Sequence, residues 1–404
     1  MTALATQLTG STTMLERSDR DLVPELHRSL ASVEPVWRAL EAEAAPFATP
    51  YQRFDWVRAF VETELGTEPQ AQAGRLRVIV LRDVRGRARA ILPLTVSRAH
   101  GVSTARVVGA KHANFHMPFF ACAEAAALVP ESLTAALVAA GRAGGIDLFL
   151  LDHQPRVFDG MPNPLSAGGH PCPSDAYGMR LGPDAEATLK RAFSGDARKK
   201  LRAKERKLVE AHGPVLHRVA TTQEMVDTIL DAFFAQKAAR FAAMGILDPY
   251  ADPAARRFVQ AATRIAPGRV PAIEVHALVA EASGRVFATF GGAVDARRFS
   301  GIWTSFDPDP EIGRSSPGDL LLSKLIGQQT EAGRHAFDLG VGEARYKANT
   351  CDETIELVER IIPVTLAGRA HAWIALGRLE ARRRIKRSPR LLAAVQRLRR
   401  LRTR

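Results

Sequence analysis

A proline-rich stretch at residues 155–175 divides this chain into two halves with the same order of predicted elements. Proline fixes φ and lacks a backbone N–H, so prolines among glycine and serine are typical of a linker. The stretch contains five of them: Pro155, Pro162, Pro164, Pro171 and Pro173. On each side the pattern predicts helices, an antiparallel hairpin, a further strand, a helix and a central strand. We therefore expect a duplicated α/β unit, with domains at 31–175 and 176–368.

The first half begins with polar, aperiodic residues, and we expect 1–30 to form a flexible lead-in. Two β-rich runs flank the turn sequence DVRGR, which predicts a hairpin. The elements expected in this half are helices within 31–65, strands at 76–82, 88–98 and 103–109, a helix at 132–142 and a buried strand at 146–152.

The second half contains the longest helical pattern, 184–212, which includes the basic run 198–207. The elements expected after it are a strand at 214–220, helices at 222–243 and 253–266, hairpin strands at 272–281 and 286–295, a strand at 298–305, a helix at 317–333 and a strand at 335–340. We expect 355–366 to close this second sheet and 369–404 to form a basic amphipathic helix.

The positive charge of the chain is concentrated in two segments. The 404 residues carry a formal net charge of +13, of which residues 198–207 contribute +6 and residues 378–404 contribute +11, leaving −4 on the rest. The distribution predicts two local basic features and argues against a general nucleic-acid-binding surface.

Cysteine usage, hydropathy and missing motifs exclude several classes of protein. Cys122, Cys172 and Cys351 are far apart and form no CxxC pair, so we expect no zinc site or disulfide framework. His112 and His116 have i,i+4 spacing without a suitable third ligand, so we expect no metal. The chain lacks a signal-peptide pattern and the ~20 apolar residues of a membrane span, which predicts a cytoplasmic protein. The absence of GxSxG, GxxxxGK[ST] and HExxH argues against serine hydrolases, P-loop proteins and zincins.

The sequence RSSPGDL at 314–320 has the features of a helix start that binds an anion. Ser315 or Ser316 is suited to the N-cap and Pro317 to the first turn. Gly318 allows another group to approach the backbone closely. Unpaired amides and the positive end of the helix dipole favour an anion such as a pyrophosphate. The alternative is an ordinary capped helix.

A second informative segment is FDLGVGEARYKA at 337–348. Asp338 lies at the end of a predicted buried strand, where ligands of open α/β sheets gather. Tyr346 and Lys347 begin the next element, and a lysine there can neutralise a phosphate or an acidic substrate. The structural alternative is that Asp338 caps a loop and Tyr346 packs in the core. For Asp338 we favour an orienting role over direct catalysis.

Together these segments resemble the GNAT acyltransferase superfamily. The resemblance is closer to the tandem-GNAT group of cellulose-biosynthesis-associated (CelD-like) acetyltransferases, which is related to the FemAB-type transferases. It rests on the basic helix FSGDARKKLRAKERKL, on Arg240 ahead of Gly245, on SPGDLLL and on FDLGVGEARYK. It covers about 185–365, whereas the first half fits only loosely. The resemblance implies a mixed α/β (α+β) fold of two tandem GNAT-like domains followed by a basic C-terminal helix.

The resemblance also implies a function: transfer of an acetyl or other acyl group from acyl-CoA to an amine or hydroxyl of a polysaccharide or cell-envelope precursor by direct attack. Acyl-CoA would lie in a V-shaped opening between two central strands, with its pyrophosphate on the amides of 316–320. The family loop has glycine and a small residue where this chain has Pro317 and Asp319. The CoA-binding residues would be Arg314, Ser315, Ser316, Pro317, Gly318, Asp319 and Leu320.

In this family a tyrosine often protonates the departing thiolate, which would be the role of Tyr346. Asp338 is the one side chain that we name as a candidate base. Arg240, Trp303 and Lys347 are the candidate substrate contacts, although an arginine near a helix end often bonds carbonyls and a tryptophan in a strand is more often part of the core.

Two alternatives stay open. FemAB-like relatives use aminoacyl-tRNA, whose phosphates the basic helix at 198–207 would hold. Otherwise the fold is degenerate and the protein is a non-enzymatic membrane-surface factor. In either case a cytoplasmic protein could be peripheral to the inner membrane. In the C-terminal segment an apolar stripe among arginines would lie on an anionic membrane surface. That stripe consists of Leu391, Leu392, Val395, Leu398 and Leu401.

Overall fold

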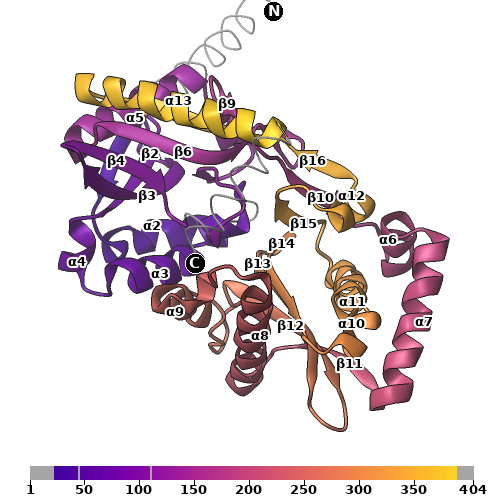
Figure 1. Ribbon diagram of the computed structural model, residues 1–404. Coiled ribbons are helices and arrows are strands. Elements are labelled where there is room, and N and C mark those ends of the chain that lie inside the picture. Colours follow the sequence, from indigo (N-terminus) through magenta and orange to yellow (C-terminus); the bar gives the residue numbers. More distant parts are fainter. Residues whose placement is uncertain (1–21, 44–45, 110–111, 389–404) are drawn as a thin grey trace, which may run out of the picture. The chain divides into compact units, whose positions relative to one another are not determined.

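The computed structural model describes residues 22–43, 46–109 and 112–388, and the chain divides into two compact units (Figure 1). The first unit contains the chain up to Pro173 together with Ile355–Arg383. The second contains Ser174–Thr354 together with the chain from Arg384. The boundary between them therefore falls within the proline-rich stretch.

The first unit is built on one mixed sheet with helices packed against it. Its strands follow the order β1-β2-β3-β4-β6-β17-β9, and β5 pairs with β3. The elements are β1 (Val23–His27), α2 (Leu30–Ala42), α3 (Phe54–Leu65), α4 (Pro69–Ala73), β2 (Leu76–Arg82), β3 (Ala88–Ala99), β4 (Val102–Val107), β5 (Phe119–Phe120), α5 (Pro130–Gly144), β6 (Leu148–Pro155), β7 (Val157–Phe158), β8 (Met161–Pro162), β9 (His170–Pro171), β17 (Leu357–Pro363) and α13 (Leu366–Arg387).

The second unit has a seven-stranded sheet in the order β11-β12-β13-β14-β15-β10-β16. Its elements are β10 (Ala176–Arg180), α6 (Ala185–Ala192), α7 (Gly195–His212), β11 (Val215–Val219), α8 (Gln223–Met244), α9 (Pro253–Ala262), β12 (Ile273–Ala280), β13 (Val286–Val294), β14 (Arg298–Phe306), α10 (Pro310–Arg314), α11 (Pro317–Glu331), β15 (Ala336–Val341), α12 (Arg345–Thr350) and β16 (Glu353–Ile355).

The two units repeat one order of elements. An edge strand and two helices lead into three antiparallel strands, then a helix and a strand that is parallel to the last of the three. In the first unit these are β1, α2 and α3, β2 to β4, α5 and β6; in the second they are β11, α8 and α9, β12 to β14, α11 and β15. The predicted α/β fold with a duplicated unit is thus confirmed.

One strand differs from its predicted place. We expected 355–366 to close the second sheet, but β17 pairs antiparallel with β6 in the first sheet. The corresponding place beside β15 is taken by β10, which directly follows the proline-rich stretch and was not predicted. Periodicity indicates that a strand is buried, but it does not identify the strand's partner. Residues 355–368, which we assigned to the second domain, therefore belong to the first unit.

Three further boundaries differ. The expected helix at 184–212 is two helices, because Ser194 leaves helical geometry and its side chain accepts a hydrogen bond from the Ala197 amide to start α7. The expected lead-in at 1–30 contains β1 and the start of α2. The C-terminal helix begins at Leu366 rather than 369, and its apolar stripe at 391–401 lies outside the described residues.

The sheet of the second unit is covered on both faces. Helix α8 packs on one face, where the Trp303 ring lies 4.1 Å from that of Phe233. Helix α11 packs on the other, against a core that includes Phe290, Phe299 and Phe337. Strand β13 is buried along its whole length. Position 291 requires glycine because a Cβ there would lie 2.2 Å from the Trp303 ring.

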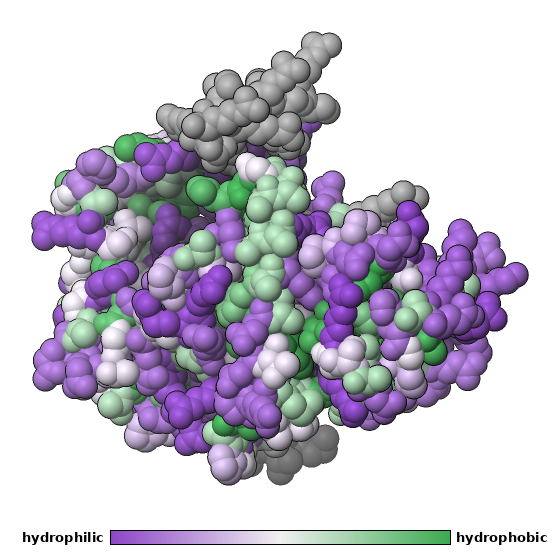
Figure 2. Space-filling view, turned by 60° about the horizontal axis from the view of Figure 1, so that its bottom comes forward, coloured by the Kyte–Doolittle hydropathy of each residue, from purple (hydrophilic) through white to green (hydrophobic). Residues whose placement is uncertain are grey.

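Hydrophilic side chains are spread over the face shown in Figure 2, between smaller apolar areas. Within the described ranges, every helix is too short or too polar to cross a bilayer.

Candidate active site

The central feature of the second unit is a fork between its two parallel strands. β14 and β15 pair at only three positions, Arg298↔Ala336, Phe299↔Phe337 and Ser300↔Asp338. β14 then continues to Phe306 and β15 to Val341 without further pairing to each other. Because backbone groups need hydrogen-bond partners, the separating edges offer a place for an extended ligand. This is the V-shaped opening that the resemblance implied.

Asp338 ties the two strands together at the point where they separate. Its side chain is fully buried, accepts a hydrogen bond from Ser300 Oγ and lies 3.4 Å from Arg298 Nη1. Burial raises the pKa of Asp338 to about 6, although the Arg298 guanidinium and the Ser300 hydroxyl oppose the rise. A carboxylate enclosed by its own strands is placed to orient the fork, and this geometry does not support its predicted role as the base.

The start of α11 differs from the expected anion cradle. Ser316 occupies the N-cap position, but it has a left-handed φ of 45° and its side chain makes no capping bond. The amides of the first turn are largely used: Ser316 N–H donates to Gly313, while Asp319 and Leu320 donate to the Ser316 carbonyl. Three of the amides that we expected to face a pyrophosphate therefore already have partners.

Lysine side chains of α7 approach this helix start instead. Lys204 Nζ donates to Ser316 Oγ at 2.6 Å, although the two residues are 112 positions apart. Beside this contact, α7 and α10 enclose a cavity of about 520 Å³. Its charged and polar lining includes Lys200, Lys204, Lys207, His212, Arg314 and Ser315, with Glu311 paired to Arg314 at 2.9 Å.

These lysines were missed as site residues, since the run 198–207 was treated as one basic segment. The signal that identifies them is helical spacing: Lys200, Lys204 and Lys207 are at i, i+4 and i+7 and so share one face of α7. With Arg314 they give the cavity a positive potential that suits a polyanion.

Phe306 and Arg240 complete the surroundings of the helix start. The Arg240 guanidinium lies 4.8 Å from the centre of the Phe306 ring. A Cβ built on Gly318 would lie 3.9 Å from Phe306 Cδ1, so these residues are neighbours and the space at Gly318 is otherwise open. The structure thus brings Arg240, a predicted substrate contact, near the α11 start through a phenylalanine that we did not predict.

The other predicted contacts have different surroundings. Trp303 is buried against α8 and belongs to the core. Lys347 is buried, and its Nζ donates to the carbonyls of Gly340 at 3.1 Å and Val341 at 3.0 Å, which fastens α12 to the end of β15. Burial lowers the pKa of Lys347. These two side chains serve the fold and are not available to a substrate.

Tyr346 is the predicted residue that keeps a suitable position. It is 41% exposed at the start of α12. Partial burial raises the pKa of its hydroxyl, and the nearby Cys351 and Asp319 raise it further. Asp319 belongs to the first turn of α11. A raised pKa keeps the hydroxyl protonated, as a proton donor requires.

Within the described ranges, His, Cys, Asp and Glu side chains form no group of three or more that could hold a metal ion.

Comparisons with known proteins agree with this geometry. Residues 195–348 match the family described as "Acetyltransferase (GNAT) domain". No curated protein matches the sequence. Among solved structures, FemX is similar over 87% of this chain and 99% of its own, with 10% identity and a TM-score of 0.57. A conserved protein of unknown function from Bacteroides thetaiotaomicron is similar over 84% of this chain and 99% of its own, with 9% identity and a TM-score of 0.51.

The match to the GNAT domain lies within the second unit, and the first unit repeats the same order of elements. The chain therefore has the fold of the GNAT-type transferases, in two tandem copies. The narrower resemblance to the cellulose-biosynthesis-associated group stays a prediction.

Proposed function

We propose that the second unit transfers an acyl group from acyl-CoA to an amine or hydroxyl acceptor. The observation that carries the proposal is the arrangement at one end of the sheet. β14 separates from β15 after Ser300, its last residue Phe306 lies beside Gly318 at the start of α11, and Ser316 of that helix start contacts Lys204, which lines the cavity. A GNAT domain match over the same residues supports this reading.

The phosphates of CoA would be held by side chains. Lys200, Lys204 and Lys207 supply three ammonium groups beside the α11 dipole, which adds a partial positive charge at its N-terminus. The Ser316 hydroxyl, now bonded to Lys204, would lie at the edge of the bound phosphate. The pantetheine arm would then extend into the fork and pair with the free edge of β14 as a short strand does.

The chemistry would be a single displacement. The acceptor nitrogen or oxygen attacks the thioester carbonyl, a bond to that carbon forms, and the carbon–sulfur bond breaks. The thiolate leaves with the electron pair and takes the proton of the Tyr346 hydroxyl, which is then restored from the proton that the acceptor loses. Asp338 would hold the two strands at the separation that this geometry needs.

The acceptor would be a polysaccharide or cell-envelope precursor, a class that rests on the family resemblance. Arg240 on the Phe306 ring would contact it, since a cation and an aromatic face together suit a sugar bearing a negative charge. The Lys237 ammonium lies 5.5 Å from the Phe241 ring on the same helix, and burial lowers its pKa.

Calorimetry with acetyl-CoA tests the donor. Lys204→Met should weaken binding by about 10- to 100-fold, because a charge-assisted contact to phosphate contributes on the order of 1.5–3 kcal/mol. Arg206→Met removes the same charge from an exposed side chain of α7 that does not line this cavity. It should leave the affinity for acetyl-CoA unchanged. Acyl transfer would be followed as release of free thiol with amino sugars and neutral sugars as acceptors. Failure of acetyl-CoA to bind the wild-type chain would refute the proposal.

The fold similarity to FemX favours one alternative donor, aminoacyl-tRNA. Seven basic residues in 198–207 would then contact RNA phosphates. Salt distinguishes the two donors: log affinity for tRNA should fall steeply with log salt, by roughly 0.7–0.9 per phosphate contacted, whereas CoA offers few phosphates. Steep salt dependence of tRNA binding without acetyl-CoA binding would favour this alternative.

An anionic membrane surface is the partner that α13 would suit. Leu366 is 81% exposed, Trp373 77% and Ile374 50%, on a helix that ends in Arg384, Lys386 and Arg387. Exposed apolar side chains flanked by basic ones favour the interface of anionic lipids. Such a contact would bring a cytoplasmic enzyme to envelope precursors at the inner membrane.

A further inference from the structure

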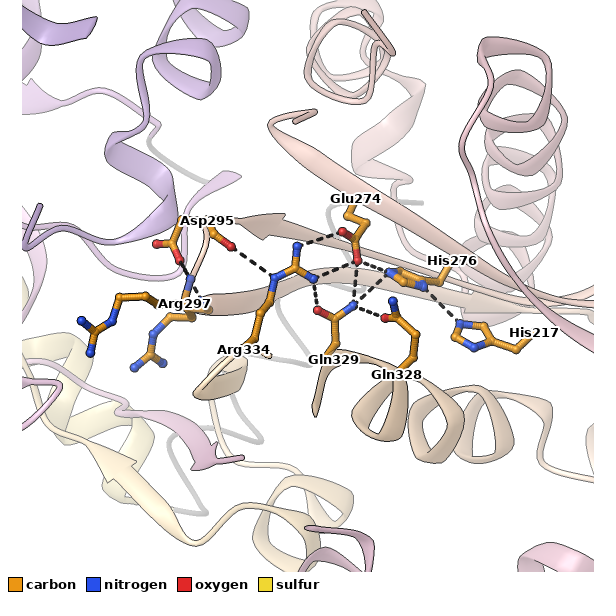
Figure 3. Close-up of polar contacts among 9 residues, drawn as sticks. His217, Glu274, His276, Asp295, Arg297, Gln328, Gln329 and Arg334 are labelled. Atoms are coloured by element: carbon orange, nitrogen blue, oxygen red, sulfur yellow. Dashed lines mark hydrogen bonds and ion pairs between the residues drawn. The ribbon is translucent and has the colours of Figure 1, made fainter. Parts of the chain in front are cut away.

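Polar side chains of β11, β12 and α11 form a hydrogen-bonded line within the second unit (Figure 3). His276 lies in β12 and is fully buried. Its Nε2 is 2.8 Å from Glu274 Oε1, and its Nδ1 is 3.1 Å from Nε2 of His217 in β11. The three side chains therefore form a continuous chain of hydrogen bonds from a carboxylate through two imidazoles.

Glu274 is held as an anion at one end of this chain. Arg334 donates to both of its oxygens, at 3.2 Å and 3.0 Å, and Gln329 Nε2 donates to Oε1 at 2.7 Å. Burial would raise the pKa of Glu274, but the hydrogen bonds from His276 and Arg334 outweigh it and lower the pKa well below its usual range. An ionised carboxylate only accepts hydrogen bonds.

The carboxylate fixes the tautomers of both rings. His276 must carry its proton on Nε2 to donate to Glu274, and burial lowers its pKa, so the ring is neutral and Nδ1 is an acceptor. His217 must then donate from Nε2. Burial, His276 and Lys324 lower the pKa of His217 to about 4, so this ring is neutral too and its Nδ1 keeps a lone pair. The chain thus ends in a hydrogen-bond acceptor.

His217 lines a second cavity of about 520 Å³, bounded by α6, α7 and α11. It shares no lining residue with the lysine cavity beside the α11 start. Its polar and charged lining includes His217, Arg198, Arg202, Lys324, Gln328 and Glu331. Lys324 is paired with Glu205 at 2.7 Å.

Arg198 gives this cavity its preference for an anion. Its Nε atom is buried and has no hydrogen-bond partner within the described part of the chain. Arg202 lies one helical turn further along α7 and lines the same cavity. A buried guanidinium N–H without a partner is costly, and a planar oxyanion is the group that satisfies it with two parallel bonds.

We infer that this cavity binds a small ligand that carries an oxyanion and a hydroxyl or ammonium group. The carboxylate or phosphate contacts Arg198 and Arg202, and the hydroxyl or ammonium donates to His217 Nδ1. His276 and Glu274 are positioning residues, because they fix the tautomer that presents this lone pair. The site is separate from the proposed acyl-transfer site, and its test does not depend on acyl transfer.

Calorimetry on the full chain tests the inference with two matched pairs of probes. L-lactate and glycerol 3-phosphate combine an oxyanion with a hydroxyl, whereas propionate and methyl phosphate lack the hydroxyl. We expect one hydroxyl-bearing probe to bind about ten-fold more tightly than its partner, since one added hydrogen bond to a buried acceptor is worth on the order of 1 kcal/mol or more. The pair that binds identifies the anion as a carboxylate or a phosphate.

Three variants assign the contacts. Arg198→Met should weaken both members of the binding pair by about ten-fold, because it removes a charge-assisted contact. His217→Phe should abolish only the difference in affinity between the two probes of the binding pair. Arg206→Met, on an exposed part of the same helix, should change neither. No saturable binding of any probe, equal binding within both pairs, or binding that is indifferent to Arg198→Met would overturn the inference.

A spectroscopic measurement on the full chain and on a fourth variant, Glu274→Gln, tests the tautomers of the two rings. In the ¹⁵N-histidine NMR spectrum of the full chain, His217 and His276 should both show the Nε2-protonated tautomer. Glu274→Gln should alter the signals of both rings, because the amide group can donate to His276 and reverse the chain. Retention of both tautomers in Glu274→Gln would contradict the role given to the carboxylate.

Discussion

Replacing Asp338 with asparagine should change how the stability of the fork depends on pH. The Asp338 carboxyl is fully buried, and burial raises its pKa from 3.8 to about 6 against the opposing effect of Arg298. The folded state therefore holds this proton more tightly than the unfolded chain. The stability that the carboxyl contributes is fully present below about pH 4 and is lost as the pH rises through about 6.

The size of the effect follows from the shift. One pKa unit corresponds to about 1.4 kcal/mol, so a rise from 3.8 to about 6 corresponds to about 3 kcal/mol. Asparagine does not titrate in this range. The free energy of opening the fork in the wild type, minus that in Asp338→Asn, should therefore fall by about 3 kcal/mol between about pH 4 and pH 7.

Hydrogen exchange of peptides that cover 298–306 and 336–341 measures this free energy locally, after correction for the intrinsic exchange rate at each pH. Local exchange is preferable to a global melt, because a chain of two units need not unfold in one step. The corresponding strands of the first unit, 102–107 and 148–155, serve as the internal control and should not differ between the two proteins. An equal pH dependence at 298–306 in both proteins would refute the reasoning.

Further predictions concern catalysis, packing and the membrane. Tyr346→Phe should lower kcat about 100-fold in the thiol-release assay while the affinity for acetyl-CoA stays the same, because a proton donor acts on the leaving group and not on binding; an unchanged kcat would exclude it as the acid. Gly291→Ala should destabilise the second unit by about 1–3 kcal/mol in urea, because its Cβ would meet the Trp303 ring at 2.2 Å. Gly195→Ala, which has open space around it, is the control and should have little effect. Trp373→Ala should reduce binding to phosphatidylglycerol vesicles about ten-fold, as expected for loss of a large apolar side chain from the interface; binding that survives the change, or equal binding to phosphatidylcholine vesicles, would contradict this role for α13.

Much of the fold could be predicted from local pattern. The run LRVIVLR predicted a strand at 76–82, and β2 is Leu76–Arg82. The helix at 317–333 and the strand at 335–340 correspond to α11 and β15. These elements are specified by periodicity and by breakers such as Pro317, both of which lie within the segment itself. Their repetition in both halves is what indicated a duplicated fold.

Strand partners could not be predicted in the same way. β10 and β17 each lie at the junction of the two units, and each enters the sheet through residues far away in the sequence. The pairing of Val358 with Gln154 depends on which edge is free after the other strands have assembled. Nothing in the alternation of apolar residues carries that information.

The local structure at the candidate site could be predicted only in part. The segment at 314–320 does start a helix, yet the amides of Ser315 and Ser316 donate backward to α10, where no helix was predicted. The left-handed φ of Ser316 arises from that junction of two helices. Conversely, Lys204 reaches Ser316 only because α7 folds against α11, a contact between residues 112 positions apart.

The basic helix α7 therefore has a more specific role than its composition suggests. Like charges at i,i+4 on an isolated helix cost a few tenths of a kcal/mol per pair, so seven basic residues in 198–207 weaken α7 on its own. The helix presents them in two rows: Lys200, Lys204 and Lys207 line one cavity, and Arg198 and Arg202 line the other. Between the rows, Leu201 and Leu208 pack into the core and hold the helix in place. Anions bound in either cavity would relieve the repulsion, so occupation of both sites and the stability of α7 should rise together.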